Sequence, residues 1–211
     1  MNRQLKKLFA CVSLVTLAAC SRSSKPEDTV NSFWNALEKG DTSSAKAYVA
    51  EGAADGMINL STSADSLIEF AENYELSEET AQRIQDFSSS VISVSYGGHT
   101  IQSTEKVSDT GCRVNVNVQV ADPASLQNAL EQLDYGEALS SYQEEITGIM
   151  SEKGAEAAYS RMFELIFVYL SENADSIAGN IRYTDNPVVM TLEKNEDGSW
   201  LITDISEQES N

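Results

Sequence analysis

The chain has 211 residues, which is enough for one domain that buries roughly 70% of the surface exposed by its unfolded form. Its 33 acidic residues outnumber 14 basic ones, and the formal net charge is −19. Nucleic-acid affinity depends largely on Lys and Arg side chains that displace counterions from phosphates, so this charge argues against nucleic acid as a partner. We interpret the acidity as a solvated protein surface.

Residues 1–19 show the three zones of a secretory signal peptide. A basic start, Met1–Lys7, precedes the apolar run Leu8–Leu17, and the small residues Ala18 and Ala19 follow. The apolar run is far shorter than the ~20 residues that a permanent membrane-spanning helix needs. We therefore predict that the export machinery recognises this segment and that it is then removed.

The end of the leader, Leu17-Ala18-Ala19-Cys20, resembles the lipobox of bacterial lipoproteins. The resemblance implies cleavage between Ala19 and Cys20 and attachment of a diacylglycerol to the Cys20 thiol. Two or more acyl chains make a lasting anchor, since each buried methylene contributes about 0.8 kcal/mol. We expect an extracytoplasmic protein that is anchored by lipid to a bacterial membrane, and the alternative is a plain secreted protein.

Residues 20–25 are predicted to form a short lipidated tether, and residues 26–211 a single α+β domain. Pro26 begins a helix with apolar residues at i, i+3, i+4 and i+7, and Gly40 ends it. Asp41 or Thr42 caps a second helix. Two further helical regions are predicted, one with Leu67, Phe70, Ala71 and Tyr74 on a common face and a shorter one from Ser77 through Phe87.

The apolar period then changes from 3.6 to 2 residues, which predicts strands. Ile92, Val94 and Tyr96 alternate with polar residues, and the strand resumes over residues 101–107. Gly97-Gly98 marks either a tight turn or a bulge in one long strand.

Three later strands are predicted from cleaner signals. The segment Val114–Val120 alternates strictly, which indicates one apolar and one solvated face. Val188–Leu192 and Trp200–Thr203 form a closing hairpin around the turn residues Asn195–Gly198.

A helical insertion, about residues 122–178, is predicted before the last two strands. Asp122 followed by Pro123 is a helix start signal. The last helix of the insertion, Ala155 to about Leu170, is apolar on two faces, so it is either buried on both or meets a partner. The candidate surface for an envelope protein or a small apolar ligand consists of Phe163, Phe167 and Leu170.

Three segments together resemble uncharacterised bacterial lipoprotein families with a fold like nuclear transport factor two, of the cystatin-like class. They are the opening segment Pro26–Asp41, the strand Val114–Val120 and the closing segment Asp197–Ile202. The resemblance implies N-terminal helices packed on a curved, cone-like antiparallel sheet, with a pocket on its concave face in relatives that are enzymes or bind ligands. The helical insertion departs from the simple cone and could cover or fill such a pocket.

No pattern in the chain points to catalysis, a metal or a cofactor. A zinc site needs several closely spaced His or Cys ligands, whereas after processing the chain has one histidine, His99, and one unmodified cysteine, Cys112. We expect His99 to be a surface or strand-edge residue and Cys112 to be a small, half-buried apolar one. No nucleophile elbow, phosphate-binding glycine loop or dinucleotide fingerprint is present.

The expected function is therefore a non-enzymatic binding or interaction module of the cell envelope, held at the membrane by lipid. One alternative is a cone-fold enzyme, an isomerase or a hydrolase, that uses a carboxylate in a pocket. Another is a structural envelope component.

Overall fold

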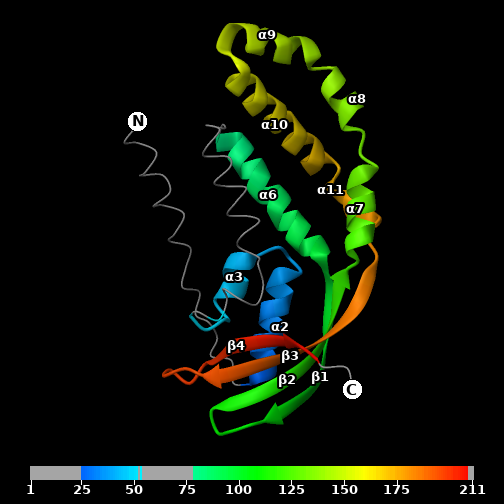
Figure 1. The fold of residues 1–211 in the computed structure, drawn as a ribbon. Coiled ribbons are helices and arrows are strands. Elements are labelled where there is room, and N and C mark those ends of the chain that lie inside the picture. Colours follow the sequence, from blue (N-terminus) through cyan, green and yellow to red (C-terminus); the bar gives the residue numbers. More distant parts are fainter. Residues whose placement is uncertain (1–24, 52, 54–77, 209–211) are drawn as a thin grey trace.

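The computed structural model is an α+β protein in which helices pack on a four-stranded antiparallel sheet (Figure 1). It describes residues 25–51, 53 and 78–208. The strands are hydrogen-bonded in the order β1-β2-β3-β4, and every neighbouring pair is antiparallel. Their bounds are Tyr96–Lys106 for β1, Gly111–Ala121 for β2, Tyr183–Lys194 for β3 and Trp200–Glu207 for β4.

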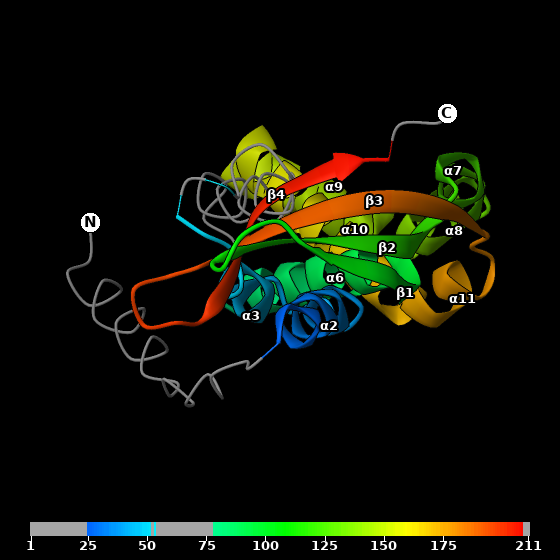
Figure 2. The same cartoon turned by 90° about the horizontal axis from the view of Figure 1, so that it is seen from below.

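The predicted α+β class and the predicted position of the helical insertion are confirmed, but the sheet is not strongly curled (Figure 2). A cone-like sheet is therefore not seen. The predicted leader, Cys20 and the predicted helix around Leu67–Tyr74 lie outside the described residues. Within the described ranges, no helix has the length and apolar character needed to span a bilayer.

Helix α2, Pro26–Leu37, lies on one face of the sheet, as the spacing of its apolar residues predicts. Pro26 occupies the first turn, where its missing amide hydrogen costs nothing, and Val30 and Leu37 are completely buried. Gly40 leaves the helix with φ of +71°, a conformation that glycine adopts without strain. Asp41 then caps α3, Thr42–Lys46, by accepting a hydrogen bond from the Ser44 amide at 2.9 Å.

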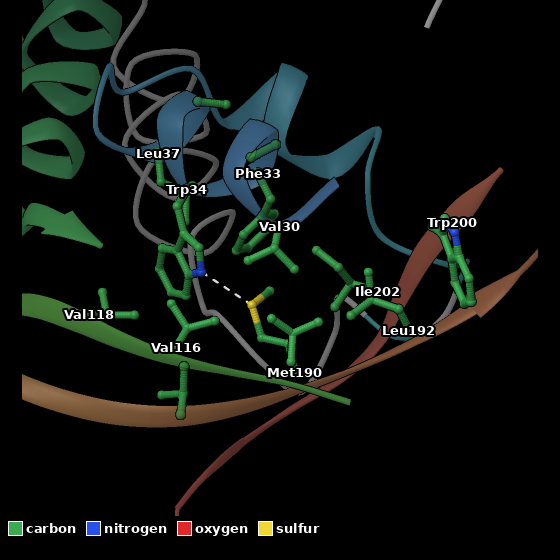
Figure 3. Close-up of a cluster of buried hydrophobic side chains, with 14 of the residues drawn as sticks. Val30, Phe33, Trp34, Leu37, Val116, Val118, Met190, Leu192, Trp200 and Ile202 are labelled. Atoms are coloured by element: carbon green, nitrogen blue, oxygen red, sulfur yellow. Dashed lines mark hydrogen bonds between the residues drawn. The ribbon is translucent and has the colours of Figure 1, made fainter. Parts of the chain in front are cut away.

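The main hydrophobic core lies between α2 and the sheet (Figure 3). On β2, Val114, Val116 and Val118 are buried while Arg113 is exposed, so the alternation in the sequence places one face of the strand in the core. Full burial of one such aliphatic side chain contributes about 1.5–3 kcal/mol. We call this core the sheet cluster; its buried members are Val30, Phe33, Trp34, Ala36, Leu37, Ala45, Ile92, Cys112, Val114, Val116, Val118, Val188, Met190, Leu192, Trp200 and Ile202.

Helix α6, Glu78–Ser95, is longer than predicted, and the strand predicted at residues 92–95 is wrong. Ile84, Ser88 and Ile92 are buried at intervals of four residues, so the same segment also fits the helical period. The Ser88 hydroxyl donates to the Ile84 carbonyl oxygen at 2.8 Å. Short apolar runs satisfy both periods, and tertiary packing decides between them.

Strand β1 begins at Tyr96 and passes through both glycines, so Gly97-Gly98 marks a bulge and not a tight turn. The pairing with β2 shifts register between Tyr96 and Gly98. A Cβ atom on Gly97 would lie 2.7 Å from a ring carbon of Tyr183, so any larger residue there would have to displace that ring.

Between β2 and β3 the chain forms the predicted helical insertion. The Asp122 side chain accepts a hydrogen bond from the Ala124 amide at 3.2 Å, which confirms the predicted helix start. The insertion lies beyond one end of the sheet, beside α6 (Figure 1). Its helices are α7, Pro123–Glu131; α8, Tyr135–Ser140; α9, Gln143–Lys153; α10, Ala155–Glu172; and α11, Ala174–Gly179.

A second hydrophobic core, which we call the helical cluster, holds the insertion against α6. Its buried members are Ile84, Ala129, Phe167, Leu170 and Ile177. Helix α6 therefore belongs to both cores, since Ile92 near its end lies in the sheet cluster.

Candidate functional site

The predicted partner surface on α10 is not an exposed patch. Phe167 and Leu170 retain only 8% and 9% of their accessible surface, and Phe163 is half-buried. The Phe167 ring meets the Phe87 ring of α6 edge to face, with 6.4 Å between centroids. Helix α10 packs against both α6 and α9, so burial on two faces explains its two apolar stripes.

An open groove lies instead along α7 and the start of α8. Its volume is about 430 Å³, and its apolar walls are formed by Pro123, Leu126, Leu130 and Tyr135. Leu126 and Leu130 are one helical turn apart, so they point to the same side of α7 and also pack against the helical cluster. This groove was not predicted, because the spacing of the two leucines shows only that they share one face of a helix and not whether another element covers that face.

Polar side chains occur at the edge of the groove. Gln127 and Glu131 complete its lining, and the Gln127 amide donates to the Glu131 carboxylate at 2.7 Å. The surrounding sequence is strongly anionic: residues 122–152 contain no Lys, Arg or His. The same stretch holds seven carboxylates, those of Asp122, Glu131, Asp134, Glu137, Glu144, Glu145 and Glu152.

A separate polar cluster joins α2 to β1. The His99 Nδ1 atom lies 2.6 Å from Oε1 of Glu38, and Nε2 lies 3.0 Å from Oδ1 of Asn31. Asn31 and Glu38 are seven residues apart, so they lie two turns apart on the same face of α2. The His99 side chain is only 9% exposed, and its ring centroid lies 6.4 Å from that of Trp34.

This cluster is built to hold two elements together. Both imidazole nitrogens of His99 face protein oxygens, so the ring is held between two positions on α2. The Trp34 indole N–H points to the Met190 sulfur at 3.2 Å, so these two side chains occupy the space between α2 and the sheet (Figure 3). His99 lies on an edge strand as predicted, but its side chain is not on the surface.

Cys112 is buried on β2 and lies in the sheet cluster. Burial raises the pKa of its thiol to about 11, and the nearby Glu27 carboxylate contributes in the same direction. Little thiolate forms near neutral pH, so the structure does not make Cys112 a reactive nucleophile.

Across the described ranges, no group of three or more His, Cys, Asp or Glu side chains is arranged to hold a metal ion. The structure thus defines an α+β protein whose helical insertion presents an apolar groove within a stretch of sequence that contains no Lys, Arg or His. No protein-family model, curated protein or solved structure matches the chain.

Proposed function

We propose that this protein is an exported lipoprotein whose α+β domain is a non-enzymatic binding module of the cell envelope. The observation that carries the proposal is Leu17-Ala18-Ala19-Cys20, which resembles a lipobox and follows a basic and an apolar zone. The Cys20 thiol receives the lipid, and the cleavage between Ala19 and Cys20 makes it the first residue.

Lipid and not charge holds the domain at the membrane. The net charge of −19 repels anionic headgroups, so the surface of the domain gives no electrostatic attraction. Helix α2 begins at Pro26, six residues after Cys20, and an extended tether of that length reaches at most about 20 Å. The domain therefore works close to the membrane surface.

The surroundings of the side chains that could act as bases or nucleophiles favour binding over catalysis. His99 is engaged through both nitrogens, and Cys112 is buried with a raised pKa. The half-buried Glu38 carboxylate pairs with His99. The apolar groove on α7 and α8, by contrast, is open to solvent and accessible to a partner.

The resemblance to lipoproteins with a fold like nuclear transport factor two is part of this proposal. The packing of α2 across an antiparallel sheet supports it. A sheet without strong curl, together with an insertion beside it, differs from the simple cone of those families.

The lipid anchor is tested by expressing the full chain in a bacterium with an alkyne-labelled fatty acid. We expect labelled protein in the membrane fraction and a mass spectrum that shows acylated Cys20 as the N-terminal residue. Cys20→Ser should abolish the label and leave the leader attached, whereas the control Cys112→Ser should keep the label. An unlabelled wild-type protein, or a mature N-terminus other than Cys20, contradicts the proposal.

A further inference from the structure

We infer that the groove lined by Pro123, Leu126, Leu130 and Tyr135 binds a cationic amphipathic helix of a partner protein. The inference rests on the proposed binding function, because it names the class of partner for the same module. It does not depend on the lipid anchor.

The apolar part of the argument comes from the walls of the groove. Leu126, Leu130 and Tyr135 are half-buried, and each still presents apolar surface to the open groove. The Tyr135 ring packs edge to face on the Tyr169 ring of α10, with 5.8 Å between centroids, and this contact restricts the movement of the wall. Covering such surface contributes roughly 25 cal/mol per Å² of apolar area.

The shape of the groove favours a helix as the occupant. Leu126 and Leu130 form an i, i+4 ridge along α7, Pro123–Glu131. Ridges of this kind pack into the grooves between side chains of a second helix. An amphipathic helix would place apolar residues at i, i+3, i+4 and i+7 against this ridge.

The charge around the groove determines which helix fits. Glu131 forms part of its lining, and Asp134 and Glu137 are exposed on the adjoining segment. No Lys, Arg or His occurs between Asp122 and Glu152 in the sequence, although the fold brings Arg161 to Glu145 on α9 and the Arg182 backbone to Asp122 at the start of α7. Lys or Arg residues that flank the apolar face of the partner meet complementary charge, while an anionic helix is repelled.

A second copy of this chain is a poor occupant for the same reason. Two copies that met through this groove would bring Glu131 of each chain, and the exposed Asp134 and Glu137 beside it, close to their counterparts. Like charges placed together across an interface oppose association.

The test uses the full lipidated chain in nanodiscs of zwitterionic phosphatidylcholine, with empty nanodiscs as the blank. The probe is a fluorescein-labelled synthetic helix of about 18 residues that carries Leu at i, i+3, i+4 and i+7 and Lys elsewhere. Fluorescence anisotropy should show saturable binding that weakens as salt is added. A peptide with Glu in place of Lys, and one with the leucines scrambled, should each bind at least about tenfold more weakly.

Charge reversal at the groove separates a specific site from general attraction to an acidic protein. Glu131→Lys should weaken binding about tenfold, whereas Glu152→Lys, on an exposed position of α9 away from the groove, should change it less than about twofold. Leu126→Gln should also weaken binding while the thermal unfolding midpoint shows that the variant is folded.

Equal effects of Glu131→Lys and Glu152→Lys overturn the inference, and so does equal binding of the Glu peptide. Dimerisation in analytical ultracentrifugation that is abolished by a change at Leu126 also overturns it, because a second copy then occupies the groove. Acylated protein that does not bind the Lys peptide would contradict this inference but not the proposed lipid anchor. Protein that binds the Lys peptide but carries no fatty acid would contradict only the proposed lipid anchor.

Discussion

The imidazole of His99 forms polar contacts through both nitrogens, and these contacts tie β1 to two positions on α2. The contact with Glu38 is largely shielded from water, since the His99 side chain is 9% exposed and that of Glu38 26%. Shielding strengthens a charge-assisted hydrogen bond, because water competes less for donor and acceptor. We therefore expect this contact to stabilise the fold more than an exposed ion pair of equal length.

A double-mutant cycle tests this expectation. His99→Ala, Glu38→Ala and the double variant should give a coupling free energy of about 1–2 kcal/mol in urea unfolding. The matched control is Lys106 with Asp109, whose N–O distance is also 2.6 Å but whose side chains are 71% and 95% exposed. The control cycle should give a coupling close to zero. Indistinguishable couplings in the two cycles would show that burial adds nothing to the His99 contact.

At the scale of elements, the backbone at the end of α2 is in direct contact with the backbone of α6. A Cβ atom on Gly40 would lie 2.1 Å from the backbone oxygen of Ser89. One turn further along α6, the Ser93 hydroxyl donates to the Glu38 carbonyl oxygen at 2.6 Å. The helix end thus approaches its neighbour more closely than any side chain at position 40 would permit.

Gly40→Ala should therefore destabilise the protein by two separate effects. The positive φ of +71° alone costs an alanine about 1–2 kcal/mol, and displacement of the α6 backbone adds about 1–3 kcal/mol. Gly198→Ala isolates the first effect, because Gly198 has a φ of +78° and no atom within 4 Å of the added Cβ. Urea unfolding of both variants measures the difference. Equal losses would mean that the close contact between α2 and α6 does not exist in solution.

At the scale of the whole molecule, two hydrophobic cores share one helix. Helix α6 contributes Ile84 to the helical cluster and Ile92 to the sheet cluster. Both tryptophans of the chain, Trp34 and Trp200, belong to the sheet cluster, so their fluorescence reports on that core alone. Because α6 is continuous, we expect the two cores to unfold together in one cooperative transition.

Interruption of α6 between the cores should uncouple them. Proline at position 90 removes a helical hydrogen bond and clashes with the preceding turn, at a cost of about 3 kcal/mol. In Ser90→Pro we expect the far-ultraviolet circular dichroism signal of the insertion to be lost at lower urea than the tryptophan signal. The two transitions should coincide in the wild type and in Ser90→Ala. Coincident transitions in Ser90→Pro as well would mean that the cores are joined by contacts other than α6.

The features that the sequence predicts correctly depend on residues close together in the chain. Pro26 and Asp122 mark helix starts through backbone groups a few residues away. The alternation of Val114–Val120 identifies the two faces of β2, and Asn195–Gly198 identifies the last hairpin. The lipid anchor at Cys20 also comes from the sequence alone and stays a prediction, because Cys20 lies outside the described residues.

Other features depend on which elements pack together, and only the tertiary structure decides them. The residues around Ile92 fit both a helix and a strand, and the packing of α6 selects the helix. Phe167 is buried because α10 lies against α6, and His99 finds Glu38 across 61 residues of chain. Local hydrogen bonds favour individual elements before they meet, but the burial of a face is determined only when a partner element covers it.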